Sequence, residues 1–159
     1  MLRPALIVLL LVLTTAGATP LDTVYDFLYA VRYGNLESSL DLLSEDLVSQ
    51  LEASCEQLIT LAETEPRLVE RMLTALGTPL RPAQVAAMDP RELLAAFLQR
   101  VPDLPENLVE EENLEMSGRR AEVRLTTVYG ARIDFELVWE EGAWRITWSS
   151  LLRDLFDSI

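Results

Sequence analysis

The sequence contains neither lysine nor histidine, and it has a single cysteine among its 159 residues. Without histidine, Ser-His-Asp and Cys-His catalytic groups and histidine-ligated zinc sites are excluded. Without lysine, Schiff-base chemistry and the phosphate-binding P-loop are excluded. Any acid–base chemistry would therefore depend on Asp, Glu, Tyr and the one thiol, Cys55. We expect no cofactor and no metal site.

The charge of the chain is strongly negative. Its 13 basic residues are all arginine, 26 residues are acidic, and the formal net charge is −13. An acidic chain without a basic patch argues against nucleic acid and anionic membrane surfaces as partners. Half of the residues are hydrophobic, which argues against disorder, and the length suffices for one domain with a sizeable core.

Residues 1–18 have the features of a secretory signal peptide. Arg3 gives a positive start, a short apolar run follows over 5–13, and Ala16-Gly17-Ala18 is a typical cleavage signal. An uncleaved anchor is the alternative, but the apolar run is shorter than the ~20 residues that span a membrane. We therefore predict cleavage after Ala18, export to the periplasm or the medium, and no stable membrane anchor afterwards.

Cys55 has no partner for an internal disulfide. It shares a helical spacing with Leu47, Leu51 and Leu58, which favours a buried structural thiol. A disulfide between two copies or a redox role is the alternative.

The remainder, 19–159, is predicted to form a single α+β domain whose helices occupy 22–101. The first helix covers 22–33 and ends before Gly34, and Ser44 and Asp89 are typical N-caps of later helices. Pro66 suits the first turn of another helix. Pro102 and Pro105 are predicted to end the helices and open a linker, whose acidic part, ENLVEEE over 106–112, leads into the meander.

Residues 112–149 predict an antiparallel meander of four strands. Apolar and charged residues alternate along each strand, so one face is apolar and the other is charged and solvated. Three turns fix the register: Ser117-Gly118, Val128-Tyr129-Gly130 and Glu141-Gly142. The predicted pairs on the apolar face are Leu125–Ile133, Val123–Phe135, Leu137–Ile146, Trp139–Trp144 and Phe135–Trp148, with Leu114 opposite Ala121 upstream.

Two stretches together form helices followed by a curved antiparallel meander: TVYDFLYAVRYGNLESSLDLL over 23–43, and the meander over 121–148 with WEEGAWRI near its end. In this plan the chain resembles the nuclear transport factor 2-like superfamily, the cone-shaped fold that ketosteroid isomerase shares. The small exported bacterial members of unknown function are the most similar. Residues 44–101 hold more helix than a minimal member, which indicates either a lid over the cone or a different topology.

The resemblance implies a cavity between the helices and the sheet. The residues that would line it, and so bind a small apolar ligand, are Tyr25, Tyr29, Phe135, Leu137, Trp139, Trp144 and Trp148. The alternative is that these side chains simply fill the core. Tyr25, Tyr29 and Tyr33 recur every four residues and so share one helix face, as either a pocket wall or half-buried packing.

Two functions follow from these observations. The first is an exported, non-catalytic domain that binds a small apolar ligand or an envelope protein. The second is an isomerase or hydrolase of the ketosteroid isomerase type, which would use Tyr25 or Tyr29 with Asp41 or Asp134. The sequence predicts neither the ligand nor the oligomeric state.

Overall fold

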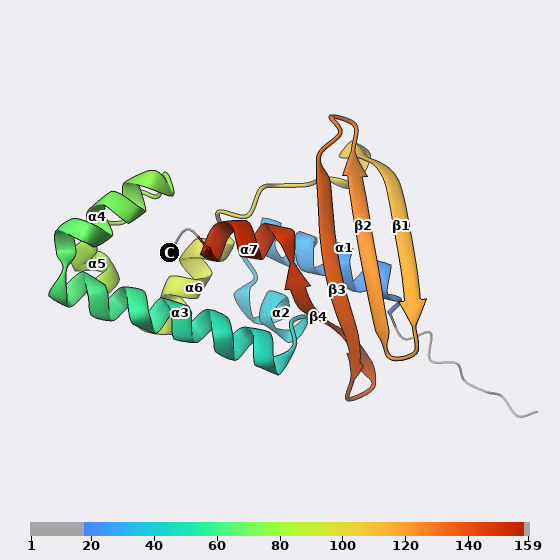
Figure 1. Ribbon diagram of the computed structural model, residues 1–159, viewed down its shortest axis with the longest axis horizontal. Coiled ribbons are helices and arrows are strands. Elements are labelled where there is room, and N and C mark those ends of the chain that lie inside the picture. Colours follow the sequence, from blue (N-terminus) through green and yellow to red (C-terminus); the bar gives the residue numbers. More distant parts are fainter. Residues whose placement is uncertain (1–17, 158–159) are drawn as a thin grey trace, which may run out of the picture.

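The computed structural model describes residues 18–157 and shows an α+β fold (Figure 1). The helices of the N-terminal half are α1 (Pro20–Arg32), α2 (Leu36–Asp41), α3 (Glu45–Thr64), α4 (Pro66–Ala75), α5 (Pro82–Ala86) and α6 (Pro90–Leu98). The C-terminal half comprises a short 3-10 helix η1 (Glu106–Leu108), strands β1 (Val109–Ser117), β2 (Arg120–Thr127), β3 (Arg132–Glu140) and β4 (Ala143–Ser149), and helix α7 (Ser150–Phe156). The predicted fold class is confirmed, whereas all but the last residue of the predicted signal peptide lies outside the described residues.

The helix boundaries follow from local capping. Thr19 and Asp22 form a capping box at the start of α1, and Asp89 and Glu92 form another at the start of α6. The Ser44 side chain accepts a hydrogen bond from the first turn of α3. These caps satisfy amide groups that the first turn of a helix leaves without partners.

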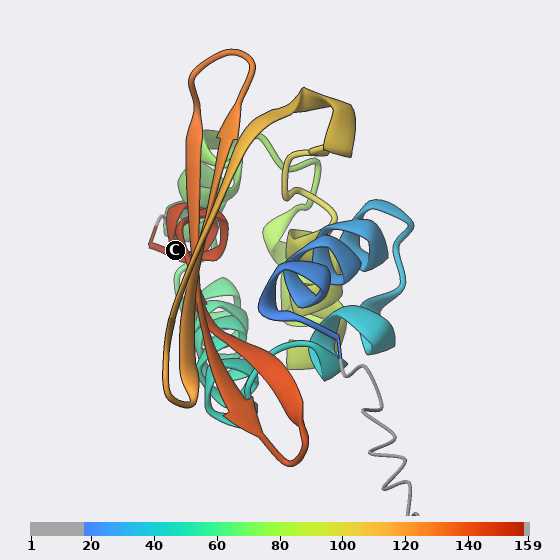
Figure 2. The same cartoon turned by 90° about the vertical axis from the view of Figure 1, so that its right-hand side faces the viewer.

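Helix α1 lies across one face of the sheet and contacts β2 and β4 (Figure 2). Its buried stripe includes Val24, Phe27, Leu28 and Val31, which recur at helical spacing. These residues belong to one buried cluster that continues through α3 and α6 into the sheet. The core therefore fills the space between α1 and the apolar face of the meander.

The four strands form an antiparallel sheet in the order β1-β2-β3-β4. Four predicted pairs of the apolar face are confirmed: Leu125–Ile133, Val123–Phe135, Leu137–Ile146 and Trp139–Trp144. The β3–β4 turn is the predicted Glu141-Gly142, with φ angles of 48° and 80° that a type I′ turn requires. Parity of turn length therefore gives the correct register in the centre of the sheet.

Two predicted pairings are wrong, each because of the local backbone. The first is the predicted pair Leu114–Ala121. Gly118, with a φ of 61°, takes the first central position of the β1–β2 turn, so the turn consists of Gly118 and Arg119. Leu114 therefore pairs with Val123. The second is the predicted pair Phe135–Trp148. The register between β3 and β4 shifts after the Leu137–Ile146 pair, so that Trp148 lies opposite Glu136 and Phe135 lies opposite Ser149. The extra residue is Thr147, a β-bulge that turns Trp148 to the charged face.

The predicted acidic linker is also corrected. Residues 106–108 form η1, and 109–112 are the first four residues of β1. Glutamate is depleted in strands in general, but an edge strand leaves its side chains in water. Pairing with β2 therefore overrides the low strand propensity of this segment.

Helices α4 and α5 lie at the far end of α3, away from the sheet (Figure 1). They contact α3 and each other through buried side chains, among them Leu58, Leu73 and Val85. Of the helices in 44–101, α4 and α5 thus extend the molecule away from the sheet and do not cover it as a lid would, whereas α3 contacts β4.

The two edges of the sheet differ. The edge of β4 is covered where α2 meets α3, because Ile146 exchanges backbone hydrogen bonds with Leu42 and Ser44, both of 2.8 Å. Strand β1 pairs with β2 alone, and no described element lies beyond it (Figure 1). The backbone of β1 therefore presents an open edge.

Candidate binding surfaces

Three of the predicted pocket residues lie inside the core. Phe135 and Leu137 are each 1% exposed and Trp144 is 8% exposed. They pack in the same buried cluster as Phe27 and Val24 of α1. Their side chains occupy the region where the resemblance implies a cavity, as the core-filling alternative expects.

Trp139 lies at the margin of that core. Its ring meets Trp144 edge-on, with 5.5 Å between the ring centroids. The side chain is half-buried and contributes to the wall of a surface cleft. The predicted aromatic pair is confirmed, and it joins the core to the surface.

Trp148 is placed on the wrong face by the sequence prediction, because the β4 bulge turns it outward. The Arg153 guanidinium lies 5.5 Å from the centre of its ring. With Glu122 and Glu136, it lines a hollow of about 190 Å³ on the charged face. Trp148 thus does not share a cavity with Trp144.

The tyrosines of α1 do not line a pocket together. Tyr29 is 65% exposed and Tyr33 is 63% exposed, with 4.4 Å between their ring centroids. The hydroxyl of Tyr25 donates a hydrogen bond to the Glu112 carboxylate of β1. The pKa of the Tyr25 phenol is raised, mainly by partial burial and further by this hydrogen bond and the nearby negative charge. The phenol therefore stays protonated and ties α1 to β1.

The groups that an isomerase would need lie apart. Asp134 is on the charged face, where its carboxylate accepts hydrogen bonds from Arg124 at 2.8 Å and Arg132 at 3.0 Å. Burial opposes its ionisation, but the two arginines together hold the pKa of Asp134 below its ordinary value. Asp41 lies in a cleft whose described lining contains no tyrosine. The carboxylate that accepts the hydrogen bond from Tyr25 is that of Glu112, which is exposed.

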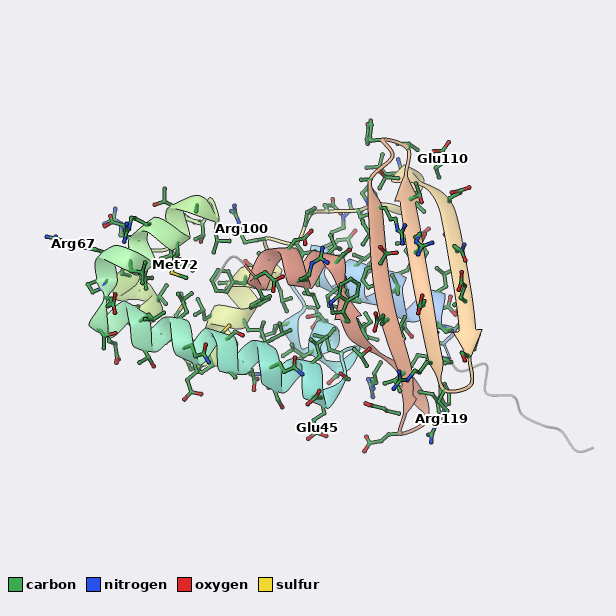
Figure 3. The ribbon with its side chains drawn as sticks, viewed as in Figure 1. Glu45, Arg67, Met72, Arg100, Glu110 and Arg119 are labelled. Atoms are coloured by element: carbon green, nitrogen blue, oxygen red, sulfur yellow. The ribbon has the colours of Figure 1, made fainter. Side chains whose placement is uncertain are left out.

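A large open cleft of about 1120 Å³ lies between the start of α3 and the β3–β4 hairpin. Figure 3 labels Glu45 and Arg119, which lie on its two sides. Its charged lining residues are Asp41, Glu45, Asp46, Glu52, Glu140, Glu141, Arg91, Arg119 and Arg145. Arg91 is already paired with Glu37 at 3.0 Å and Glu52 at 3.4 Å. The cleft is thus polar and acidic, and unsuited to an apolar molecule.

The open edge of β1 is a surface that the sequence analysis missed. It carries Glu110, Glu111, Glu112 and Glu115 within nine residues. Leu114 and Met116 on the same strand are 40% and 57% exposed. The run VEEENLEMS contains this signal, but the acidic charge of its first residues favours a linker when the sequence is taken alone.

Cys55 is a free, fully buried thiol on α3. Burial raises the pKa of this thiol to about 12, and Glu52 nearby adds to the effect. The group is therefore protonated and shielded at neutral pH, as a structural thiol would be. In residues 18–157, no cluster of three or more carboxylates or thiols is arranged to hold a metal ion.

Comparisons of the chain with protein-family models, curated proteins and solved structures found no match. The resemblance to the nuclear transport factor 2-like superfamily therefore stays a prediction. Within the part of the chain that the structure describes, no helix is both long and apolar enough to cross a membrane.

Proposed function

We propose that this chain is an exported, non-catalytic module that binds a protein partner at its surface. The observation that carries the proposal is the contrast between a filled interior and an unpaired outer strand. Phe135, Leu137 and Trp144 are packed within the core, while β1 leaves its backbone edge and two apolar side chains exposed. Filled space leaves no room for a small ligand, whereas an open strand can pair with another chain.

Chemical considerations support the same proposal. Of the carboxylates suggested for catalysis, Asp134 is held ionised by two arginines, and Asp41 has no tyrosine beside it in its cleft. A general base needs a pKa near the working pH and a reacting group within reach. Asp134 does not meet the first condition, and the cleft that holds Asp41 offers no tyrosine to meet the second. A binding role requires no such group.

Export is part of the proposal and rests on the features of residues 1–18. The absence of an internal disulfide is no obstacle, because the core cluster runs without a break from the helices to the sheet. We further propose membership of the nuclear transport factor 2-like superfamily, which the order of helices and meander supports.

Native mass spectrometry of the full chain, produced with its N-terminal segment and purified from the exported fraction, tests this function. We expect a processed polypeptide that carries no small hydrophobic molecule. A retained compound that is lost from the Trp144→Ala variant but kept by Trp148→Ala would overturn the proposal in favour of an interior apolar site. Failure to recover any exported protein would contradict the proposed location.

A further inference from the structure

Strand β1 offers a row of backbone groups that no described residue uses. Ser117 and Arg120 flank the two-residue turn, so this pair exchanges both of its backbone hydrogen bonds. Hydrogen-bonded and non-bonded pairs then alternate along the strand. The amides and carbonyls of Glu112, Leu114 and Met116 consequently point away from β2, toward solvent. Another extended chain can bind there by continuing the sheet.

The side chains beside this edge differ between the two faces of the sheet. Glu111 and Glu115 lie on the charged face, and Leu114 and Met116 lie on the apolar face. Across the sheet, Glu115 is opposite Glu122, which is itself opposite Glu136. Carboxylates placed directly opposite one another repel, so positive charge from a partner would stabilise this row.

A second copy of this chain does not suit the edge. Pairing two β1 strands would bring eight glutamates together, since each strand carries four. Like charges at that density oppose association. The glutamates could instead serve only to protect the edge from unwanted pairing, since charged side chains do so on many edge strands. A strand with this protective role alone would not also expose two large apolar side chains, Leu114 and Met116.

We propose that β1 binds an extended, basic segment of a partner protein, which adds to the sheet as a fifth strand with arginine or lysine alternating with apolar residues. The basic side chains lie against Glu111 and Glu115, and the apolar ones lie against Leu114 and Met116. The alternation follows from the period of two along a strand. This inference rests on the proposed function and specifies the chemistry of the partner.

The first test uses a synthetic probe, a blocked nine-residue peptide in which arginine and valine alternate. A second peptide has the same composition, with all its arginines preceding its valines. We expect the alternating peptide to bind the full chain at least tenfold more tightly, and to slow hydrogen exchange at the amides of Leu114 and Met116. Equal affinities, or protection that is absent from β1, would overturn the proposal.

The second test uses matched charge changes. The double substitution Glu111→Arg and Glu115→Arg should weaken binding of the alternating peptide at least tenfold, since it removes the complementary charge. Glu56→Arg and Glu63→Arg together, on exposed positions of α3, make the same charge change far from β1 and should alter the affinity less than twofold. Equal losses in the two variants would mean that net charge alone attracts the peptide, and would refute strand addition.

The two proposals can fail separately. If the peptide does not bind but the native mass shows no small ligand, the β1 assignment is wrong and the binding function survives. If a hydrophobic compound is retained inside the protein, the proposed function is wrong whatever the peptide does.

Discussion

Asp134 and its two arginines illustrate how charge is arranged at the residue scale. The Asp134 side chain is 31% exposed and accepts hydrogen bonds from both Arg124 and Arg132. Neighbouring Glu122 and Glu136 have no comparable cationic partner in the described structure. The charged face therefore combines one satisfied ionic cluster with a row of uncompensated carboxylates.

We predict that Asp134→Asn lowers the free energy of unfolding by about 1 kcal/mol at pH 7, the upper range for a partly exposed ion pair. Because the folded-state pKa lies below the ordinary 3.8, this contribution is present above that pH and is lost as the pH falls below it. Urea unfolding of both proteins at several pH values measures the difference. Asp26→Asn, an exposed control on α1, should have little effect at any pH. A gap that persists unchanged in acid would contradict the account.

At the scale of elements, the β4 bulge separates two tryptophans that simple alternation would place together. Trp144 points into the core, whereas Trp148 lies on the outer face beside Arg153. The bulge allows Ser149, which is 1% exposed, to cap α7 at the end of the strand. One inserted residue thus both ends the sheet and redirects an aromatic side chain.

The two tryptophans should therefore respond differently to the same substitution. Trp144→Ala should lower the free energy of unfolding by about 3–5 kcal/mol, the usual cost of truncating a large core side chain. Trp148→Ala should cost about 1 kcal/mol, because it removes a surface cation–π contact. Guanidinium unfolding curves provide the comparison. Similar losses for the two variants would show that the bulge is misplaced.

The β3–β4 turn contains a removable source of strain. Glu141 has a φ of 48°, a left-handed conformation that is unfavourable for most residues and better tolerated by asparagine. We predict that Glu141→Asn raises the free energy of unfolding by about 0.5–1 kcal/mol. Glu140→Asn, one residue earlier within β3, changes the charge equally and should bring no gain. A larger gain at position 140 would indicate that relief of repulsion is responsible.

At the scale of the whole molecule, the sheet occupies one end, α4 and α5 occupy the other, and α3 runs between them (Figures 1 and 3). The sequence was sufficient to predict the fold class, the helix caps at Ser44 and Asp89 and the central register, because these depend on local rules such as the capping box and turn parity. It placed the start of the first helix at 22, whereas Thr19 caps α1 and the helix begins at Pro20. It could not predict the bulge at Thr147, because a bulge changes how the residues of a strand pair and not which residues the strand contains.

The candidate site was predicted less well than the fold. Alternation identified an apolar face, but it could not distinguish a lined cavity from a filled core, which depends on how α1 packs against Phe135 and Trp144. The acidic start of β1 locally favours a linker because strand propensity is a local property, whereas its pairing with β2 is a tertiary interaction. A meander implies the strand order, but only tertiary packing decides that residues 42–44 cover the edge of β4 while the edge of β1 stays open.

The central claim is that recognition occurs at the outer strand of the sheet. It can be tested by placing a photo-reactive amino acid at Met116 of the full chain in the cells that naturally produce it. Arg67, at the far end of the helical extension, provides the control position (Figure 3). We predict a crosslinked protein from position 116 that is weak or absent from position 67 and lost when Glu111 and Glu115 are changed to arginine. Equal crosslinking from both positions, or none from position 116, would contradict the account.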